Sequence, residues 1–462
     1  MTTIRKGAPC APAMAMLRNL RTGARGAPLC LAIAALLSAP TLLAAQLGSY
    51  NPRPGAQGTF AIRGGHIFSA NGPDIANGTV IISGGKITAV GANVAVPNGA
   101  TVIDASGLSV YPGMMETSTS LGLAEITEGA NATVDNSEVG RLNSNMHAFW
   151  AFDPHSAEIG VTRFVGITHV VTAPTGGLIS GQAALMNLAG DTPPQMAVVP
   201  SVAMVISLPG GGGGGRGGGA GGPAATGAAA NAPLDSIKNI LRDASAYGNS
   251  WTAYNKDKTL PRPHHDLALE ALLPVINGTM PVMFPADNMA GIRGAVTFAE
   301  EMKIKPIIVG GRDAYRMADY LKQHNVPVIL TGVLSLPGGA DDPYDINYSA
   351  PGKLAAAGVK FAIASGSPNP DIRNLPFVAG MAGAFGLSKE DALKSVTLWP
   401  AQIFGVGDKL GSIEVGKIAN IVVTDGDLLE ARTNTKYLFI DGRAVPLDNK
   451  HTDLYKAFKD RP

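Results

Sequence analysis

The stretch VYPGMMETSTSLG, residues 110–122, separates two regions of the chain that have different sequence patterns. Its apolar residues are interrupted by a Pro-Gly pair and give way to a run of small hydroxyl side chains. Successive side chains of a strand point to opposite faces, so we expect Glu116, Ser118 and Ser120 on one face and the two intervening threonines on the other. The face that carries the serines is predicted to line a pocket.

Short apolar strands separated by glycine turns precede this stretch. The Gly64-Gly65 and Gly84-Gly85 pairs each lie between apolar runs, and they predict hairpins because glycine readily adopts positive φ. The same pattern returns near the C-terminus, at residues 411–445. Two such segments at opposite ends of the chain predict one small β-sandwich, formed jointly by residues 46–111 and 405–462.

Strands and helices alternate between these two β segments. Apolar residues at helical spacing from Ile292 to Met302 are followed by an apolar run that begins at Pro306, and similar units continue toward Gly366. Such alternation with fully apolar strands indicates a parallel sheet covered by helices. We therefore predict an α/β protein in which residues 112–404 form a distorted (β/α)8 barrel of the TIM type. A doubly wound sheet is the alternative, but its glycine-rich dinucleotide fingerprint is missing.

A glycine run, PGGGGGGRGGGAGG, interrupts the predicted barrel. Glycine loses much conformational freedom on ordering, so this run predicts a loop, which we place at residues 209–233. No Lys-Ser/Thr pair follows it, as a phosphate-binding loop would require. The apolar and aromatic residues from Ile237 to Tyr254 then follow helical spacing and predict a helix that packs on the core.

The N-terminal residues 1–45 have the pattern of an export signal. Arginines precede an apolar segment at residues 27–43, which is followed by two alanines, Ala44 and Ala45. That segment is shorter than the roughly 20 apolar residues that a membrane span needs. Both cysteines, Cys10 and Cys30, lie in the part expected to be removed. We therefore expect a secreted or periplasmic protein without a disulfide, a thiolate ligand or a membrane span after cleavage.

Composition gives no indication of a charged partner. The 462 residues include 36 basic and 35 acidic side chains, for a net charge of +1, and only 15% of the residues are charged. Binding to nucleic acid or to an anionic membrane surface normally requires a basic excess. The chain is long enough for a large buried core, and nucleic acid is not expected as a partner.

Two motifs together resemble the amidohydrolase superfamily, in particular its imidazolonepropionase-like branch. They are VYPGMMETSTSLG after a short β segment, and LGSIEVGKIANIVVTD, which begins at Leu410, after the barrel. The resemblance extends from about residue 60 to about residue 445. It implies a distorted (β/α)8 barrel with a small β-sandwich. It also implies hydrolysis of amide or cyclic amide C–N bonds, by water activated on one or two divalent metals such as zinc.

The same resemblance identifies the positions at which the family holds its metals. The family uses a His-x-His pair on the first barrel strand, a bridging Lys or Glu in mid-barrel, two further histidines, and an aspartate from the last strand. These ligands fall, in chain order, on Ser118, Ser120, Asn187, Pro285, Gly310 and Gly366. Catalytic zinc requires imidazole or carboxylate donors, and none of these six residues has one. We therefore expect no metal cofactor and assign no catalytic residue.

Other polar side chains remain at the predicted mouth of the barrel. Adjacent histidines, His264 and His265, are interpreted as the start of a helix capped by Asp266 rather than as metal ligands. No histidine is placed to serve as a base for Ser118 or Ser120. A small polar ligand is expected to bind, if anywhere, at this mouth. The pocket candidates are Glu116, Ser118, Ser120, Asp287, Arg312 and Ser365.

Two functional interpretations follow, and the sequence leaves open whether the chain is an enzyme. The first is an exported pseudoenzyme that acts by binding, either as a homodimer or by pairing with an active amidohydrolase relative. The second is a hydrolase of non-peptide C–N bonds that uses a non-standard site near Asp287, Arg312 and Glu116.

Overall fold

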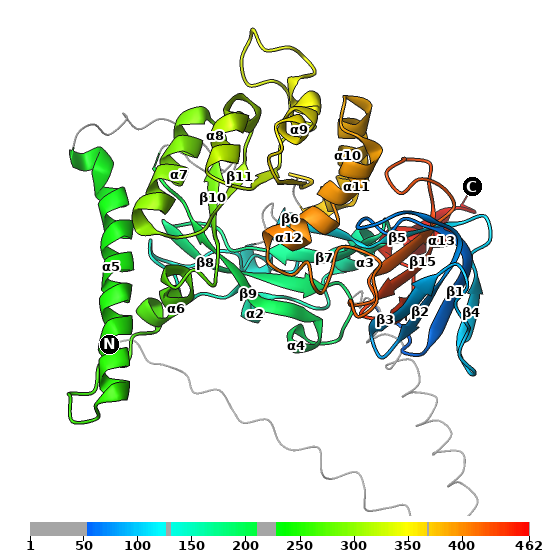
Figure 1. Ribbon diagram of the computed structural model, residues 1–462, viewed down its shortest axis with the longest axis horizontal. Helices are drawn as coiled ribbons and strands as arrows, with labels where there is room; N and C mark the ends of the chain where they lie inside the picture. The colour runs from blue at the N-terminus through cyan, green and yellow to red at the C-terminus, as the bar shows by residue number, and fades with distance from the viewer. Residues whose placement is uncertain (1–52, 126–130, 210–227, 367–368, 462) are drawn as a thin grey trace, which may run out of the picture. The chain divides into compact units, whose positions relative to one another are not determined.

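The computed structural model describes residues 53–125, 131–209, 228–366 and 369–461. The predicted signal segment 1–45, with Cys10 and Cys30, and the glycine run at 210–222 lie outside the described residues. Two eight-stranded sheets organise the described chain, and Figure 1 labels most of their strands. Residues 228–233, which the prediction assigned to the loop at 209–233, belong instead to helix α5, which begins at Ala228 in an alanine-rich segment with high helix propensity.

The first sheet draws its strands from both ends of the chain, as predicted. Its order is β16-β15-β14-β5-β1-β2-β3, and β4 also pairs with β1. Phe60 of β1 and Phe439 of β15 make an edge-to-face contact at 5.2 Å, although their strands are not neighbours, so the sheet curves around a shared apolar interior. Its strands are β1 (Phe60–Ile67), β2 (Ile75–Ser83), β3 (Lys86–Gly91), β4 (Thr101–Asp104), β5 (Ser109–Pro112), β14 (Ile421–Thr424), β15 (Thr435–Ile440) and β16 (Arg443–Val445).

One of the two predicted hairpins is present and the other is wrong. Gly84-Gly85 forms the turn between β2 and β3. Gly64-Gly65 lies inside β1, where the register with β2 shifts on both sides of Gly65. This irregularity separates the half of β1 that pairs with β4 from the half that pairs with β5. A bulge and a hairpin both favour glycine, so the sequence pattern did not distinguish them.

The second sheet is a nearly closed barrel, which confirms the predicted fold class. Its order is β13-β12-β11-β10-β9-β8-β7-β6. Its strands are β6 (Met114–Thr119), β7 (Ile167–Thr172), β8 (Ile179–Asn187), β9 (Ala197–Ile206), β10 (Val282–Ala286), β11 (Pro306–Gly310), β12 (Val328–Leu330) and β13 (Phe361–Ile363).

Strand β8 departs from the regular barrel. It is antiparallel to both β7 and β9, while the other neighbouring pairs in this sheet are parallel. The segments that join β7 to β8 and β8 to β9 contain no crossover helix longer than α4, which has four residues. Parallel neighbours need a crossover of a dozen or more residues, so these short connections produce antiparallel pairs.

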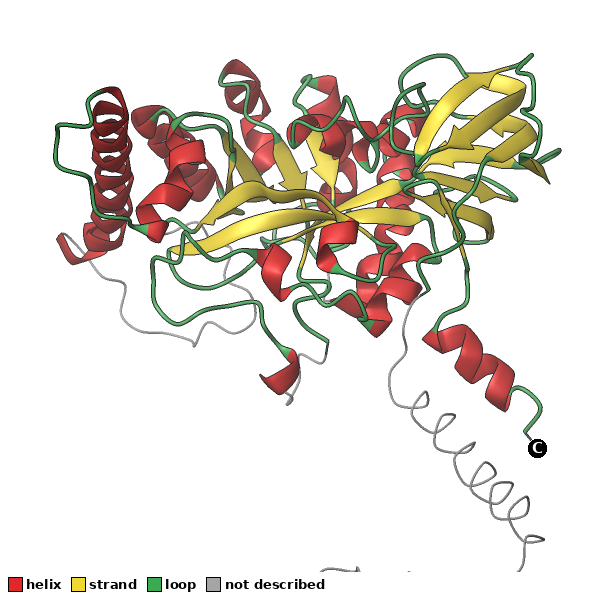
Figure 2. Ribbon diagram, turned by 90° about the horizontal axis from the view of Figure 1, so that it is seen from below, coloured by secondary structure: helices red, strands yellow, loops and turns green. Residues whose placement is uncertain are grey.

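Helices flank the barrel strands (Figure 2). The helices predicted from Ile292 to Met302 and from Ile237 to Tyr254 are both present, as α7 and α5. The helices are α2 (Ala148–Ala151), α3 (Ala157–Arg163), α4 (Pro193–Met196), α5 (Ala228–Lys256), α6 (Leu267–Ile276), α7 (Met289–Met302), α8 (Ala318–Gln323), α9 (Ile346–Ala356), α10 (Leu375–Ala384), α11 (Lys389–Ser395), α12 (Leu398–Ile403) and α13 (Lys450–Phe458). Three short 3-10 helices are η1 (Asn131–Thr133), η2 (Ala314–Met317) and η3 (Asn369–Asn374).

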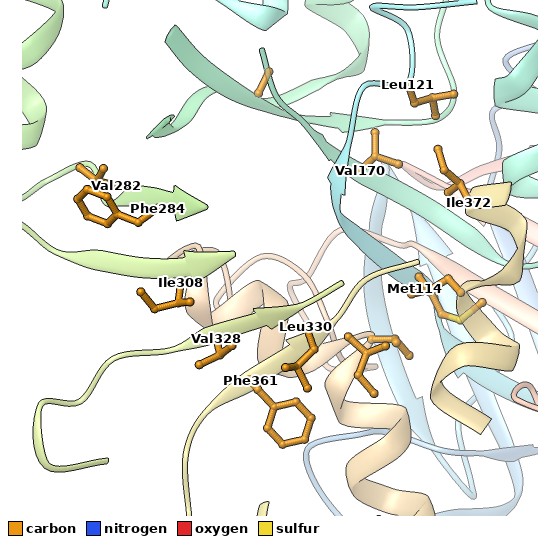
Figure 3. Close-up of a cluster of buried hydrophobic side chains, with 14 of the residues drawn as sticks. Met114, Leu121, Val170, Val282, Phe284, Ile308, Val328, Leu330, Phe361 and Ile372 are labelled. Carbon is orange, nitrogen blue, oxygen red and sulfur yellow. The ribbon is translucent and has the colours of Figure 1, made fainter. Parts of the chain in front are cut away.

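The barrel strands bury side chains on both faces. One layer includes Phe284, Ile308 and Phe361 and packs with the helices, and Figure 3 shows part of this cluster. A second, separate layer is contributed by alternate residues of the same strands, such as Met283 and Ile307. Burial on both faces explains why these strands are apolar throughout rather than alternating.

Candidate functional site

Glu116 lies at the seam where the two end strands of the barrel meet. Its side chain is fully buried on β6. One carboxylate oxygen accepts the backbone N–H groups of Thr117 at 2.9 Å and Ser118 at 3.0 Å. The other accepts the backbone N–H of Ser365, just beyond β13, at 2.8 Å. The carboxylate therefore makes hydrogen bonds between β6 and the end of β13, where the sheet order ends.

The position of Glu116 also changes the geometry of β6. The register between β6 and β7 shifts between Glu116 and Thr119, so the strict alternation expected for this stretch is not kept. The reason is local, since the Glu116 carboxylate takes two N–H groups of its own strand. Ser118 and Ser120 are both only partly buried.

Burial controls the protonation of this carboxyl group. Removal from water raises the pKa of Glu116 to about 7, and the hydrogen bonds from Ser365, Ser118 and Thr117 oppose that rise. Charged carboxylates are favoured by N–H donors and disfavoured by a dry environment, and here the dry environment has the larger effect.

Two of the positions at which the resemblance expects metal ligands are glycines with positive φ, and an added side chain would meet the backbone at Gly366 and the Asp287 side chain at Gly310. Gly366 has φ of +65°, and a Cβ atom there would overlap the carbonyl oxygen of Thr331. Gly310 has φ of +105°, and a Cβ atom there would collide with the carboxylate of Asp287. Both conformations are ones that residues with side chains rarely adopt.

Asn187 lies away from Ser118 and Ser120. It pairs with His169 of β7, which in turn pairs with Met115 near the start of β6. Its side-chain oxygen accepts a hydrogen bond from the Asn420 amide at 2.8 Å, and the same amide lies 3.2 Å from Nδ1 of His169. Asn187 therefore belongs to a buried polar network that joins the barrel to the first sheet.

Asp287 and Arg312, two of the candidate residues, lie close to each other. They follow the neighbouring strands β10 and β11, and the Arg312 backbone N–H hydrogen-bonds to the Asp287 carboxylate. Burial raises the pKa of Asp287, although the charge of Arg312 and this hydrogen bond oppose the rise. The neighbouring Asn288 caps α7 by accepting the Gly291 N–H at 2.8 Å.

The fold and one family model identify the superfamily. The chain resembles the crystal structure of an amidohydrolase from Thermotoga maritima MSB8, with a TM-score of 0.74 and 22% identity over 84% of this chain and 99% of that one. The model of the amidohydrolase family matches residues 288–445. The family match and the fold together support assignment of the chain to the amidohydrolase superfamily.

Two further relatives of this superfamily member are less similar. An imidazolonepropionase from Syntrophobacter fumaroxidans is 36% identical over 83 residues, which are 17% of this chain and 19% of that protein. The matched segment thus spans about a fifth of the relative's length. The structure of molinate hydrolase has a TM-score of 0.52 and 16% identity over 85% of this chain and 95% of that one. The structural likenesses establish the fold of this amidohydrolase-superfamily chain.

The histidines of this chain contact different residues rather than one another. Asp266 caps α6 through the N–H groups of Ala268 and Leu269, as predicted, and His265 pairs with Glu270 at 3.3 Å. Within the described ranges, no group of three or more His, Cys, Asp and Glu side chains is arranged to hold a metal ion. The helices of those ranges also include none that is long and apolar enough to cross a bilayer.

Sequence reasoning missed one His–Ser pair. Nδ1 of His147 lies 3.0 Å from the Ser201 hydroxyl, while Nε2 lies 3.4 Å from the Gln182 amide nitrogen. Because that amide can only donate, Nε2 accepts and Nδ1 carries the proton. His147 therefore donates to Ser201 and is not oriented to remove its proton. Fifty-four positions separate the two residues, and no local motif links them.

The raised pKa of Glu116 predicts a pH dependence of stability. The pKa is 4.5 in the reference state and about 7 in the folded protein, so the folded state binds the proton more tightly. The associated stabilisation is complete below pH 4.5 and is lost as the pH rises to about 7. It amounts to about 3 kcal/mol. We expect the free energy of unfolding of the wild type, minus that of Glu116→Gln, to fall by about this amount over the same interval in urea titrations. A constant difference between the two proteins would contradict the assignment.

Proposed function

We propose that this amidohydrolase-superfamily chain is a binding protein that has kept the fold and lost the metal centre. The observation that carries the proposal is the backbone at Gly366, at the position of the family's last-strand aspartate. A side chain there would overlap the carbonyl oxygen of Thr331. A restored aspartate would therefore require the backbone to move. Replacing Gly366 by aspartate would not by itself rebuild the metal site.

The donor atoms at the remaining positions support the same proposal. Ser118 and Ser120 offer neutral hydroxyls, and Pro285 has no donor side chain. Catalytic zinc is held by imidazole, thiolate or carboxylate groups. The residues at these positions do not fit such a metal, so we derive no hydrolytic step that depends on one.

Glu116 is the carboxylate nearest to the serine pair in sequence, and its contacts support a structural role. Both of its oxygens already accept backbone N–H groups. These three N–H groups take three of the roughly four lone-pair sites of a carboxylate, which leaves little acceptor capacity for a substrate proton or a metal.

The proposal includes export and pairing. The signal-like segment 1–45 supports a secreted or periplasmic location. A fold that retains its surfaces without its catalytic residues suits a role as a homodimer or as the partner of an active relative, and this step rests on analogy. Cell fractionation should recover a processed chain outside the cytoplasm, and co-purification should yield either a self-dimer or a second amidohydrolase-like chain. Recovery of the full-length chain in the cytoplasm would contradict export. Recovery of a monomer alone would contradict pairing.

Metal analysis and a substrate screen test the absence of catalysis. We expect purified protein to contain much less than one equivalent of zinc. We also expect it to leave amide, lactam and imidazolone substrates unchanged, with or without added divalent metal. Stoichiometric zinc, or hydrolysis that a chelator abolishes, would overturn the proposal. Hydrolysis that persists with chelator and disappears in Asp287→Ala would instead establish a metal-free site at Asp287 and Arg312.

A further inference from the structure

A small pocket lies on the edge of the barrel where strands β6 and β7 end. Its volume is about 230 Å³, and its lining comes from the segment after β6, from helix α2, and from the turn between β7 and β8. In barrels of this kind, ligands bind at the end of the sheet where the strands have their C-termini. The pocket is smaller than the roughly 300–1,000 Å³ that drug-sized ligands occupy, so it suits a small molecule.

An exposed tryptophan forms part of the lining. The Trp150 side chain is 74% exposed, and its ring packs edge-to-face on the buried ring of Phe149 at 4.6 Å. Large aromatic side chains are seldom left this exposed. A tryptophan face attracts a cation more strongly than any other side-chain ring does.

The charged groups of the lining all have the same sign. Asp135 and Glu138 contribute exposed carboxylates, and the lining includes no Lys or Arg. His147 also contributes, and its two ring nitrogens already contact Gln182 and Ser201. Burial lowers the pKa of His147, so the imidazole is neutral at pH 7 and does not offset the two carboxylates.

The remaining lining is mixed, with polar groups from Asn136, Ser137, Asn145 and Ser180 and an apolar wall from five residues. Met146 and Pro174 line the pocket together with Leu123 and two alanines. Such walls favour an organic ion over a hydrated inorganic one, because an inorganic ion would lose its water without gaining ligands. Two carboxylates, an exposed tryptophan and a partly apolar wall together favour a ligand that is cationic and carries an apolar part.

We infer that this pocket binds a small organic cation, with the cationic group held by Trp150, Asp135 and Glu138 and the apolar part against Met146 and Pro174. The inference rests on the proposed binding role, to which it adds a ligand class. It places the ligand in a pocket that uses none of the six candidates identified from the sequence.

Choline is a suitable cationic probe, and dimethylbutanol is its neutral control, because dimethylbutanol has the same shape with carbon in place of the charged nitrogen. Calorimetric titration of the full chain is expected to show saturable binding of choline and about tenfold weaker binding of dimethylbutanol. The double variant Asp135→Asn/Glu138→Gln and the variant Trp150→Ala should each weaken choline binding about tenfold, while Trp150→Phe retains part of it. Glu430→Gln removes an exposed carboxylate away from this pocket and should leave binding unchanged.

The outcomes separate this inference from the proposed function. Absence of saturable binding with choline at about 10 mM, where a complex with a Kd of 1 mM would be about 90% occupied, overturns the inference. Equal binding of choline and dimethylbutanol, or unchanged binding by the pocket variants with melting temperatures like the wild type, also overturns it. None of these results bears on the hydrolase screen. Conversely, choline binding by a protein that hydrolyses amides would sustain the inference and refute the non-catalytic role.

Discussion

Gly366→Ala is expected to lower the free energy of unfolding by about 4 kcal/mol, the largest effect of any single methyl group proposed here. Two terms contribute. The φ of +65° is unfavourable for alanine, and the new Cβ would overlap the carbonyl oxygen of Thr331. Removing this overlap requires movement of the segment that follows β13. That segment includes Ser365, which donates its backbone N–H to Glu116. Urea denaturation of the purified variant measures the loss.

Gly405 provides a matched control for this substitution. Its φ is +70°, close to that of Gly366, but no atom lies within 4 Å of the position of an added Cβ. Gly405→Ala should therefore lose only the backbone contribution, about 1 kcal/mol. The difference between the two variants isolates the steric overlap. Equal losses would show that position 366 has room for a side chain, and the main support for the missing metal centre would fall.

Glu116→Ala is expected to destabilise the fold by about 3–5 kcal/mol. The substitution leaves three backbone N–H groups, those of Thr117, Ser118 and Ser365, without their carboxylate acceptor in a buried setting. It also leaves a cavity at the seam between β6 and β13. The loss should appear in urea denaturation and as faster amide hydrogen exchange at the ends of these two strands.

Glu116→Gln separates the hydrogen bonds from the charge. Glutamine preserves the shape and one acceptor oxygen, but its amide nitrogen would face an N–H donor. We therefore expect a smaller loss, about 1–3 kcal/mol at neutral pH. A glutamine variant as unstable as the alanine variant would indicate that the charge, rather than the hydrogen bonds, maintains the seam. A fully stable alanine variant would refute the structural role of Glu116.

Local signals predicted much of the fold correctly. Asp266 begins α6 as predicted, because the cap depends only on residues two and three positions away. The apolar runs also predicted which segments form the barrel strands. The direction of β8 was not predicted, because a fully buried strand has the same apolar pattern in either orientation.

The candidate site was predicted less well, because its contacts join distant parts of the chain. Asp287 and Arg312 end neighbouring strands and could be paired from the barrel topology. The hydrogen bond from Ser365 to Glu116 spans 249 positions, and no periodicity links them. The pocket around Trp150 depends on the path of an irregular segment for which the sequence pattern gave no prediction.

The composite first sheet has a consequence for how the protein is made. Strand β5 ends at Pro112, and its partner β14 begins only at Ile421. A ribosome adds roughly 5–20 residues per second, so the intervening stretch of about 300 residues takes on the order of 15–60 s to synthesise. During that time β5 has an unpaired edge, which is a site for aggregation. We therefore expect the nascent chain to need a chaperone or a translocation factor until its last tenth is available, and C-terminal truncation to impair solubility before it impairs any binding function.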